Sequence, residues 1–248
     1  MKIKNTTTQI LSKTYKTLSV VIGEKTANKL KSSYFNLVNK ITDKNVSSKN
    51  DLERLRKIAA EGGQLKLHFG CGPRILKGWI NIDLAYQDDW NDHYASSDNT
   101  KGTKEDFYQI NFNEGQLPLP DNSVDAVFSE DFVEHLGQKE TIIFLSEAYR
   151  ILKAGGINRI NTPNLIASMK KHSEFSKGYD GVFQREWDKN GHINILTPGY
   201  LKELAEMIGY GQVFFTGKNQ SRSNLIPLEV RPGDDREESE QIYCDLIK

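Results

Sequence analysis

The chain has 248 residues, of which 37% are hydrophobic and 27% are charged, and its formal net charge is zero. This composition supports a folded core and excludes an intrinsically disordered chain. No apolar run reaches the roughly 18–20 residues of a membrane-spanning helix, and the first residues lack the apolar stretch of a secretory signal. Two cysteines, Cys71 and Cys244, exclude a disulfide framework, so we expect a cytoplasmic protein.

Residues 1–50 form a basic segment with ten lysines and two acidic residues, so this segment carries +8 and the rest of the chain −8. Apolar residues recur there at helical spacing on both sides of Gly23, which predicts two antiparallel helices. We expect this N-terminal helical extension to pack on the rest of the chain or to self-associate, with peripheral membrane binding as the alternative. Because the segment has no arginine and its aromatic residues lie in the apolar stripes, we expect no nucleic-acid partner.

Residues 51–248 are expected to form a single domain. Asp51 is expected to cap a short helix that ends at Gly62–Gly63. Further along the chain, apolar runs alternate with helical patterns, which predicts an α/β fold: a mostly parallel sheet with helices on both faces. The expected strands are 65–69, 79–84, 107–112, 124–129, 157–161, 213–216 and 242–247, and the expected helices are 139–152 and 198–208. The stretch 166–196 follows the fifth strand and is expected to cover an acceptor molecule.

The most informative pattern is a glycine turn followed by an acidic residue. The first strand ends at Phe69 and leads into Gly70-Cys71-Gly72, and Asp83 stands at the end of the next strand. Glycines let a ligand lie against the backbone. A carboxylate after the second strand can accept hydrogen bonds from both hydroxyl groups of a ribose. The dinucleotide pattern G-x-G-x-x-G is incomplete here, and no G-x-x-x-x-G-K-[ST] loop occurs. A ribose-bearing cofactor without phosphate groups fits these features best.

The sequence resembles the class I S-adenosylmethionine-dependent methyltransferases, in particular the broad small-molecule group of type 11. The resemblance rests on LHFGCG…GWINID, LPLPDNSVDAVFSEDFVEHL, RILKAGGINRINTPN and the stretch from His192 to Tyr210, and it covers residues 64–216. It implies a Rossmann-like seven-stranded sheet with an antiparallel last strand, and S-adenosyl-L-methionine as the cofactor.

The resemblance also implies the cofactor contacts. The glycine turn would border the methionine part, Asp83 would bind the ribose hydroxyls, and Asn111 would meet the adenine edge. Ser129 and Glu130 end the fourth strand, near the expected position of the transferring methyl group. The expected cofactor-binding residues are Gly70, Cys71, Gly72, Asp83, Asn111 and Ser129.

Three residues are candidates for acid–base chemistry: Glu130, His135 and His192. A histidine with a pKa near neutrality can take a proton from an alcohol or phenol acceptor. Asp131 is expected to open a helix, which would place Asp131, Glu134 and His135 on one face. Such a face can bind a divalent cation, but a set of three residues on one turn favours a structural role, so no metal is expected.

These residues together predict an enzyme that transfers a methyl group from S-adenosylmethionine to a small-molecule or glycan-like acceptor, at oxygen. One alternative is a partner protein that binds S-adenosylmethionine or S-adenosylhomocysteine without catalysis. A less favoured alternative is an NAD-dependent oxidoreductase.

Overall fold

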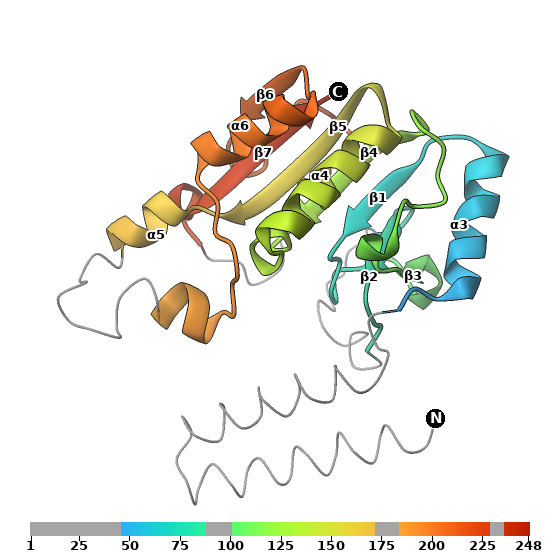
Figure 1. Ribbon diagram of the computed structural model, residues 1–248, viewed down its shortest axis with the longest axis horizontal. Helices are drawn as coiled ribbons and strands as arrows, with labels where there is room; N and C mark the ends of the chain where they lie inside the picture. Colours follow the sequence, from blue (N-terminus) through green and yellow to red (C-terminus); the bar gives the residue numbers. More distant parts are fainter. Residues whose placement is uncertain (1–45, 88–100, 172–183, 229–235) are drawn as a thin grey trace, which may run out of the picture. The chain divides into compact units, whose positions relative to one another are not determined.

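The computed structural model describes residues 46–87, 101–171, 184–228 and 236–248 (Figure 1). Residues 46–248 form one compact unit. The predicted N-terminal helices lie outside the described residues, so their fold and their association with a membrane or a second copy stay predictions. Within the described residues, no helix is long and apolar enough to cross a membrane.

Seven strands form one sheet, in the order β3-β2-β1-β4-β5-β7-β6. Neighbouring strands from β3 through β5 are parallel, whereas β7 runs antiparallel to both β5 and β6. This topology confirms the predicted Rossmann-like, mostly parallel sheet, including its antiparallel last strand. The strands are β1 Lys66–Phe69, β2 Ile80–Asp83, β3 Phe107–Gln109, β4 Val124–Glu130, β5 Leu152–Pro163, β6 Gln212–Phe215 and β7 Gln241–Ile247.

The main core lies on one face of this sheet. Helices α3 (Lys49–Glu61), α4 (Gln138–Ile151) and α6 (Pro198–Ile208) contribute buried side chains to it, and α4 and α6 run side by side across the front of the sheet in Figure 1. On the other face, Ala126 and Phe128 pack with the loop residues Leu76, Trp79 and Ile226. Among the described residues, therefore, loops cover the face where helices were also expected.

The start of α3 differs from the prediction. Ser48 is the N-cap and its side chain accepts a hydrogen bond from the backbone N–H of Asp51, so the expectation that Asp51 caps the helix was wrong. Asp51 instead accepts hydrogen bonds from Arg54 (2.6 Å) and from the backbone N–H of Gln109 in β3 (3.1 Å). The carboxylate thus ties the first turn of α3 to the edge strand.

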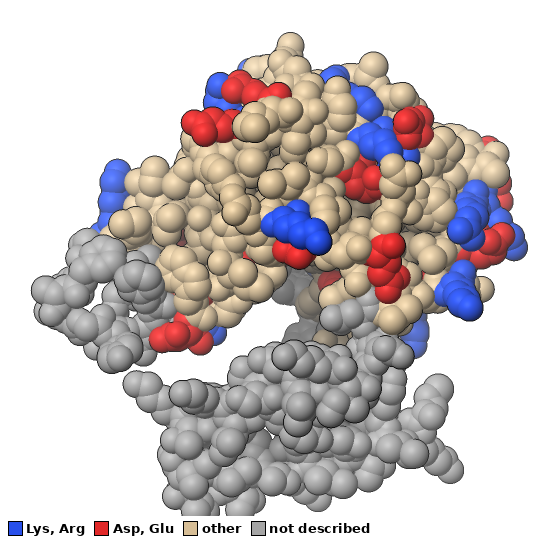
Figure 2. Space-filling model, in the orientation of Figure 1, with Lys and Arg blue, Asp and Glu red and all other residues tan. Residues whose placement is uncertain are grey.

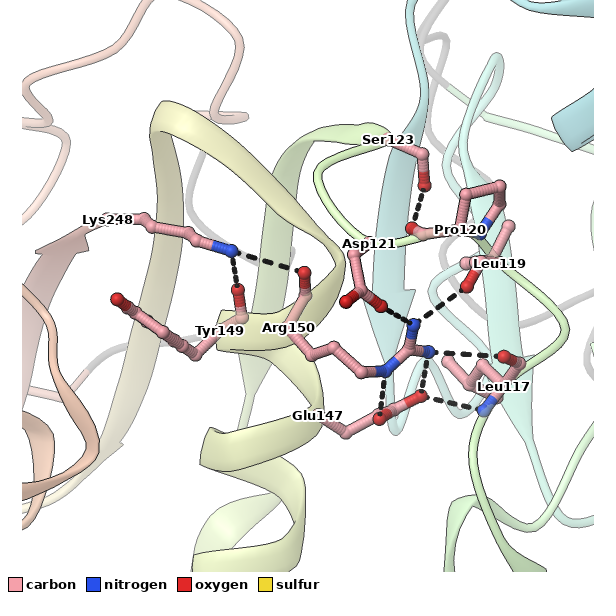
Figure 3. Close-up of polar contacts among 9 residues, drawn as sticks. All are labelled: Leu117, Leu119, Pro120, Asp121, Ser123, Glu147, Tyr149, Arg150 and Lys248. Atoms are coloured by element: carbon pink, nitrogen blue, oxygen red, sulfur yellow. Dashed lines mark hydrogen bonds and ion pairs between the residues drawn. The ribbon is translucent and has the colours of Figure 1, made fainter.

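Arg150, at the end of α4, clamps the loop that leads into β4 (Figure 3). Its guanidinium donates to Glu147, to Asp121 and to the backbone carbonyls of Leu117 and Leu119. Glu147 in turn accepts the backbone N–H of Leu117 at 2.7 Å. The motif that begins LPLPD and the motif that begins RILK therefore meet at the amino end of β4. Their contacts stabilise the fold at the edge of the sheet opposite to the glycine turn.

The predicted acceptor region, 166–196, is partly described. It contains most of α5 (Leu165–Lys171) and a π-helix (Gln184–Lys189), while residues 172–183 lie outside the described part. Short 3-10 helices occur at Lys104–Asp106, Phe112–Glu114, Val133–His135 and Glu238–Glu240. On the face seen in Figure 2, acidic and basic side chains of the described residues are interspersed.

Candidate active site

The glycine turn after β1 is fastened to the end of β2. The backbone N–H of Cys71 donates to the carbonyl of Ile82 (3.2 Å), and the N–H of Gly72 donates to Asp83 Oδ2 (2.8 Å). Asp83 Oδ1 accepts the N–H of Leu84 (2.7 Å). Burial raises the pKa of the Asp83 carboxyl, and these two backbone donors act in the opposite direction. The predicted glycine turn and the predicted acid are therefore in direct contact.

The two glycines of the turn meet different constraints. Both have positive φ, +62° at Gly70 and +49° at Gly72. A Cβ at Gly70 would overlap the ring of Phe132, whereas a Cβ at Gly72 would meet no protein atom within 4 Å among the described residues. Gly70 is thus required by packing, and Gly72 leaves open space beside the backbone. Cys71 between them is buried, and burial raises the pKa of its thiol, as expected for a small packing residue.

Asn111 and Ser129 are the other two predicted cofactor contacts. Asn111 follows β3, and its Oδ1 accepts the backbone N–H of Asn113 (3.0 Å), which starts a 3-10 helix. The backbone N–H of Asn111 also donates to the hydroxyl group of Ser47, and that hydroxyl group donates to the Asn111 carbonyl. Ser129 in β4 is fully buried, and its hydroxyl group has no hydrogen-bond partner among the described residues.

Glu130, the last residue of β4, is engaged at both carboxylate oxygens. Oε2 accepts a hydrogen bond from Arg74, which lies just after the glycine turn, and Oε1 accepts one from Asn161 (3.2 Å). Arg74 and Glu130 are both largely buried, at 11% and 9% side-chain exposure. This ion pair connects the turn after β1 with the end of β4, so Glu130 is held in place by a cation.

Asp131 does not open a helix. It has a positive φ of 48°, and the helical turn that follows, Val133–His135, has Phe132 at its N-cap without any side-chain cap. Its carboxylate is bound by both Nη atoms of Arg236 (2.8 and 2.9 Å). The expectation that Asp131, Glu134 and His135 share a helix face was therefore wrong, because the chain turns sharply at Asp131.

Glu134 is fully buried at the carboxyl end of β4. Its Oε2 accepts a hydrogen bond from Thr162 (3.0 Å), while Oε1 has no hydrogen-bond partner among the described residues. Burial, reinforced by the charge of Asp131, raises the pKa of Glu134 to about 8. Burial therefore opposes a negative charge on this carboxyl group unless a cation lies beside it.

The two histidines predicted as bases lie next to each other. The rings of His135 and His192 pack edge to face with centroids 5.1 Å apart. His192 is buried, and its Nδ1 lies 2.9 Å from Glu186 Oε2. His135 is exposed; desolvation and the neighbouring His192 lower its pKa, which favours the neutral ring.

Backbone hydrogen bonds create this pairing. The N–H groups of Ile193 and Asn194 both donate to the carbonyl of Glu134, at 2.7 and 3.0 Å. They dock the segment that carries His192 against the turn that carries His135. This proximity was not predicted from the sequence, and neither was the contact of Glu186, which lies on the π-helix in a stretch without periodic pattern. Nothing local in the sequence marks either feature.

The sheet order, with its antiparallel β7, is that of the class I methyltransferase fold. Residues 67–160 match the family described as methyltransferase domain. Over these residues the chain is therefore similar to a methyltransferase domain.

Known proteins with similar sequences carry corresponding names. A "Probable S-adenosylmethionine-dependent methyltransferase" of Mycolicibacterium smegmatis is 36% identical over 98 residues, which is 40% of this chain and 33% of that protein. A protein of the same name from Mycobacterium tuberculosis is 38% identical over 68 residues, 27% of this chain and 22% of its own. The matched region thus spans about a third or less of these relatives. A crystal structure of a SAM-dependent methyltransferase from Archaeoglobus fulgidus has 19% identity and a TM-score of 0.49, and the match covers 87% of this chain and 99% of that one.

Proposed function

We propose that the protein transfers a methyl group from S-adenosylmethionine to a small-molecule or glycan-like acceptor, at oxygen. The observation that carries the proposal is the contact between Gly72 and Asp83. Each oxygen of the Asp83 carboxylate accepts one backbone N–H, at 2.7 and 2.8 Å, and so keeps a lone pair for a hydroxyl group. Two ribose hydroxyls would use these two positions.

The rest of the cofactor would follow the carboxyl edge of the sheet. The open space beside Gly72 would take the methionine part, which would lie along the turn formed by Gly70, Cys71 and Gly72. Asn111 would meet the adenine ring at the end of β3. The buried hydroxyl of Ser129, at the end of β4, would donate to the cofactor near its methyl group.

The histidine pair would handle the acceptor's proton. Methyl transfer is an in-line displacement, so the protein must align acceptor and methyl group and must accept a proton when the acceptor is an alcohol. Glu186 fixes Nδ1 of His192 and leaves Nε2 for a proton, and the lowered pKa of His135 favours its neutral ring. The acceptor oxygen would therefore lie beside these two rings. Glu130, held by Arg74, would support the site without taking the proton.

Binding and turnover separate this proposal from its alternatives. Calorimetry with S-adenosylhomocysteine and with NADH tests the cofactor: we expect binding of the first and none of the second. Incubation with methyl-labelled S-adenosylmethionine and fractionated cell extract tests turnover. A labelled product supports the enzyme, while cofactor binding without any labelled product would favour the non-catalytic partner protein. Binding of NADH alone would favour the oxidoreductase.

A further inference from the structure

Three side chains with metal-binding groups converge at the end of β4. Glu134 and His135 lie on the short helical turn after the strand, and His192 is brought to them by the two hydrogen bonds to the Glu134 carbonyl. One ligand atom from each of the three side chains lies within 4.8 Å of the others. The three groups come from two chain segments that are far apart in sequence.

His192 is held by a partner that leaves one ligand atom available. Glu186 binds Nδ1 of His192, so Nε2 remains. The ring of His135 packs edge to face against that of His192. Histidines that bind metals are commonly oriented in this way, by a carboxylate or a carbonyl on the other ring nitrogen.

Glu134 provides an independent indication of a ligand. Thr162 donates to its Oε2 at 3.0 Å, but Oε1 is buried without a hydrogen-bond partner in the described part of the chain. A buried acceptor without a partner is unfavourable, and a bound cation would satisfy it. Asp131 is not available for this purpose, because Arg236 binds both of its carboxylate oxygens.

We propose that Glu134, His135 and His192 bind a divalent transition-metal ion of the Zn²⁺ type. Two imidazole nitrogens and one carboxylate oxygen suit such an ion, whereas Mg²⁺ and Ca²⁺ prefer sites made of oxygen ligands. In a tetrahedral zinc site the ligand atoms lie about 3.3 Å apart, so the group must contract slightly on binding. His135 is exposed and can make that movement. Three protein ligands leave a fourth position for water or for an oxygen of the acceptor.

The proposal that the ion binds does not depend on the proposed function. The role of the ion in methyl transfer does rest on that function. If the protein methylates an oxygen, a metal at this position would bind the acceptor hydroxyl and make it more acidic. Both imidazoles would then serve as ligands and not as bases, and the hydroxyl proton would pass to solvent water on the exposed side of His135.

Metal binding can be measured on the full chain without an affinity tag, after removal of metals with a chelator. Titration with ZnCl2 alone should show one Zn²⁺ per chain, and Co²⁺ should give the absorption bands of a site with nitrogen and oxygen ligands. His192→Ala and His135→Ala should each raise the Kd by on the order of 100-fold or more, and Glu186→Gln by about 10- to 100-fold through the orientation of His192. His68→Gln removes a described histidine whose Nδ1 pairs with Asn81 and which is not one of the three ligands; it serves as the control and should leave the Kd unchanged.

Two results would overturn the metal site: no stoichiometric Zn²⁺ binding by the unaltered chain, or binding that persists in a double variant lacking both imidazoles. Thermal unfolding of each variant shows whether it is folded, and Glu134→Gln offers a second variant of nearly the same shape. The affinity of the metal-free chain for S-adenosylhomocysteine is measured separately. Loss of that affinity would count against the proposed function, and loss of Zn²⁺ binding against the metal site.

Discussion

Replacement of Asp83 by asparagine tests the cofactor site with the smallest change of shape. The carboxylate accepts hydrogen bonds from Gly72 and Leu84 with its two oxygens, and the proposal gives each oxygen one ribose hydroxyl as well. In Asp83→Asn one oxygen becomes an NH₂ group, which cannot accept. One charge-assisted hydrogen bond to the ribose is then lost, at about 1.5–3 kcal/mol. The Kd for S-adenosylhomocysteine should rise about 10- to 150-fold.

The assay is calorimetric titration with S-adenosylhomocysteine at neutral pH, together with thermal unfolding. The fold should survive, because burial already disfavours the charge of Asp83 and the uncharged amide avoids that penalty. Asp121→Asn removes the same charge from an exposed carboxylate at the amino end of β4, and it should leave the Kd unchanged. A Kd of Asp83→Asn for S-adenosylhomocysteine within about threefold of the Kd of the unaltered chain would refute the proposed contact between Asp83 and the ribose.

Three further predictions concern the fold around the site. Gly70→Ala should destabilise the protein by about 1–3 kcal/mol, measured by urea unfolding, because the added Cβ meets the ring of Phe132 at a positive φ. Arg159→Met should lower the free energy of unfolding by about 3–5 kcal/mol. The reason is that the fully buried carboxylate of Asp245, 3.0 Å from the Arg159 guanidinium, would lose its positively charged partner. A decrease below about 1 kcal/mol would contradict this prediction. Burial lowers the pKa of His68 to about 3, so stability should fall as the pH drops from 6.5 towards 3, by up to about 1.4 kcal/mol per pH unit. His68→Gln should flatten this pH dependence, and unfolding curves collected across that range check it.

The sheet could be predicted from the sequence because its signals are local. Each strand has its own apolar run, and the turns between them carry glycines or polar residues. The start of α3 could not be fixed in this way, because Ser48 and Asp51 are both good capping residues and only the contact of Asp51 with Gln109 decides between them. The sequence likewise gave no sign that loop residues such as Trp79 would cover the second face of the sheet.

The sequence points to the individual residues of the candidate site but not to their arrangement, and their roles stay predictions. Asp83 and the glycine turn were placed correctly relative to each other, because they end neighbouring parallel strands. His135 and His192 were recognised separately, but their contact depends on backbone hydrogen bonds between distant segments, which no local pattern reports. The expected grouping with Asp131 failed for a related reason: helical spacing was assumed where the chain turns at a positive φ.

A crystal structure of the full chain with S-adenosylhomocysteine would test the central claim most directly. We predict that both ribose hydroxyl oxygens lie within hydrogen-bond distance of the Asp83 carboxylate, about 2.5–3.0 Å, with the amino acid part of the ligand beside Gly72. A nucleoside bound elsewhere on the sheet, or an empty turn at saturating ligand, would contradict it.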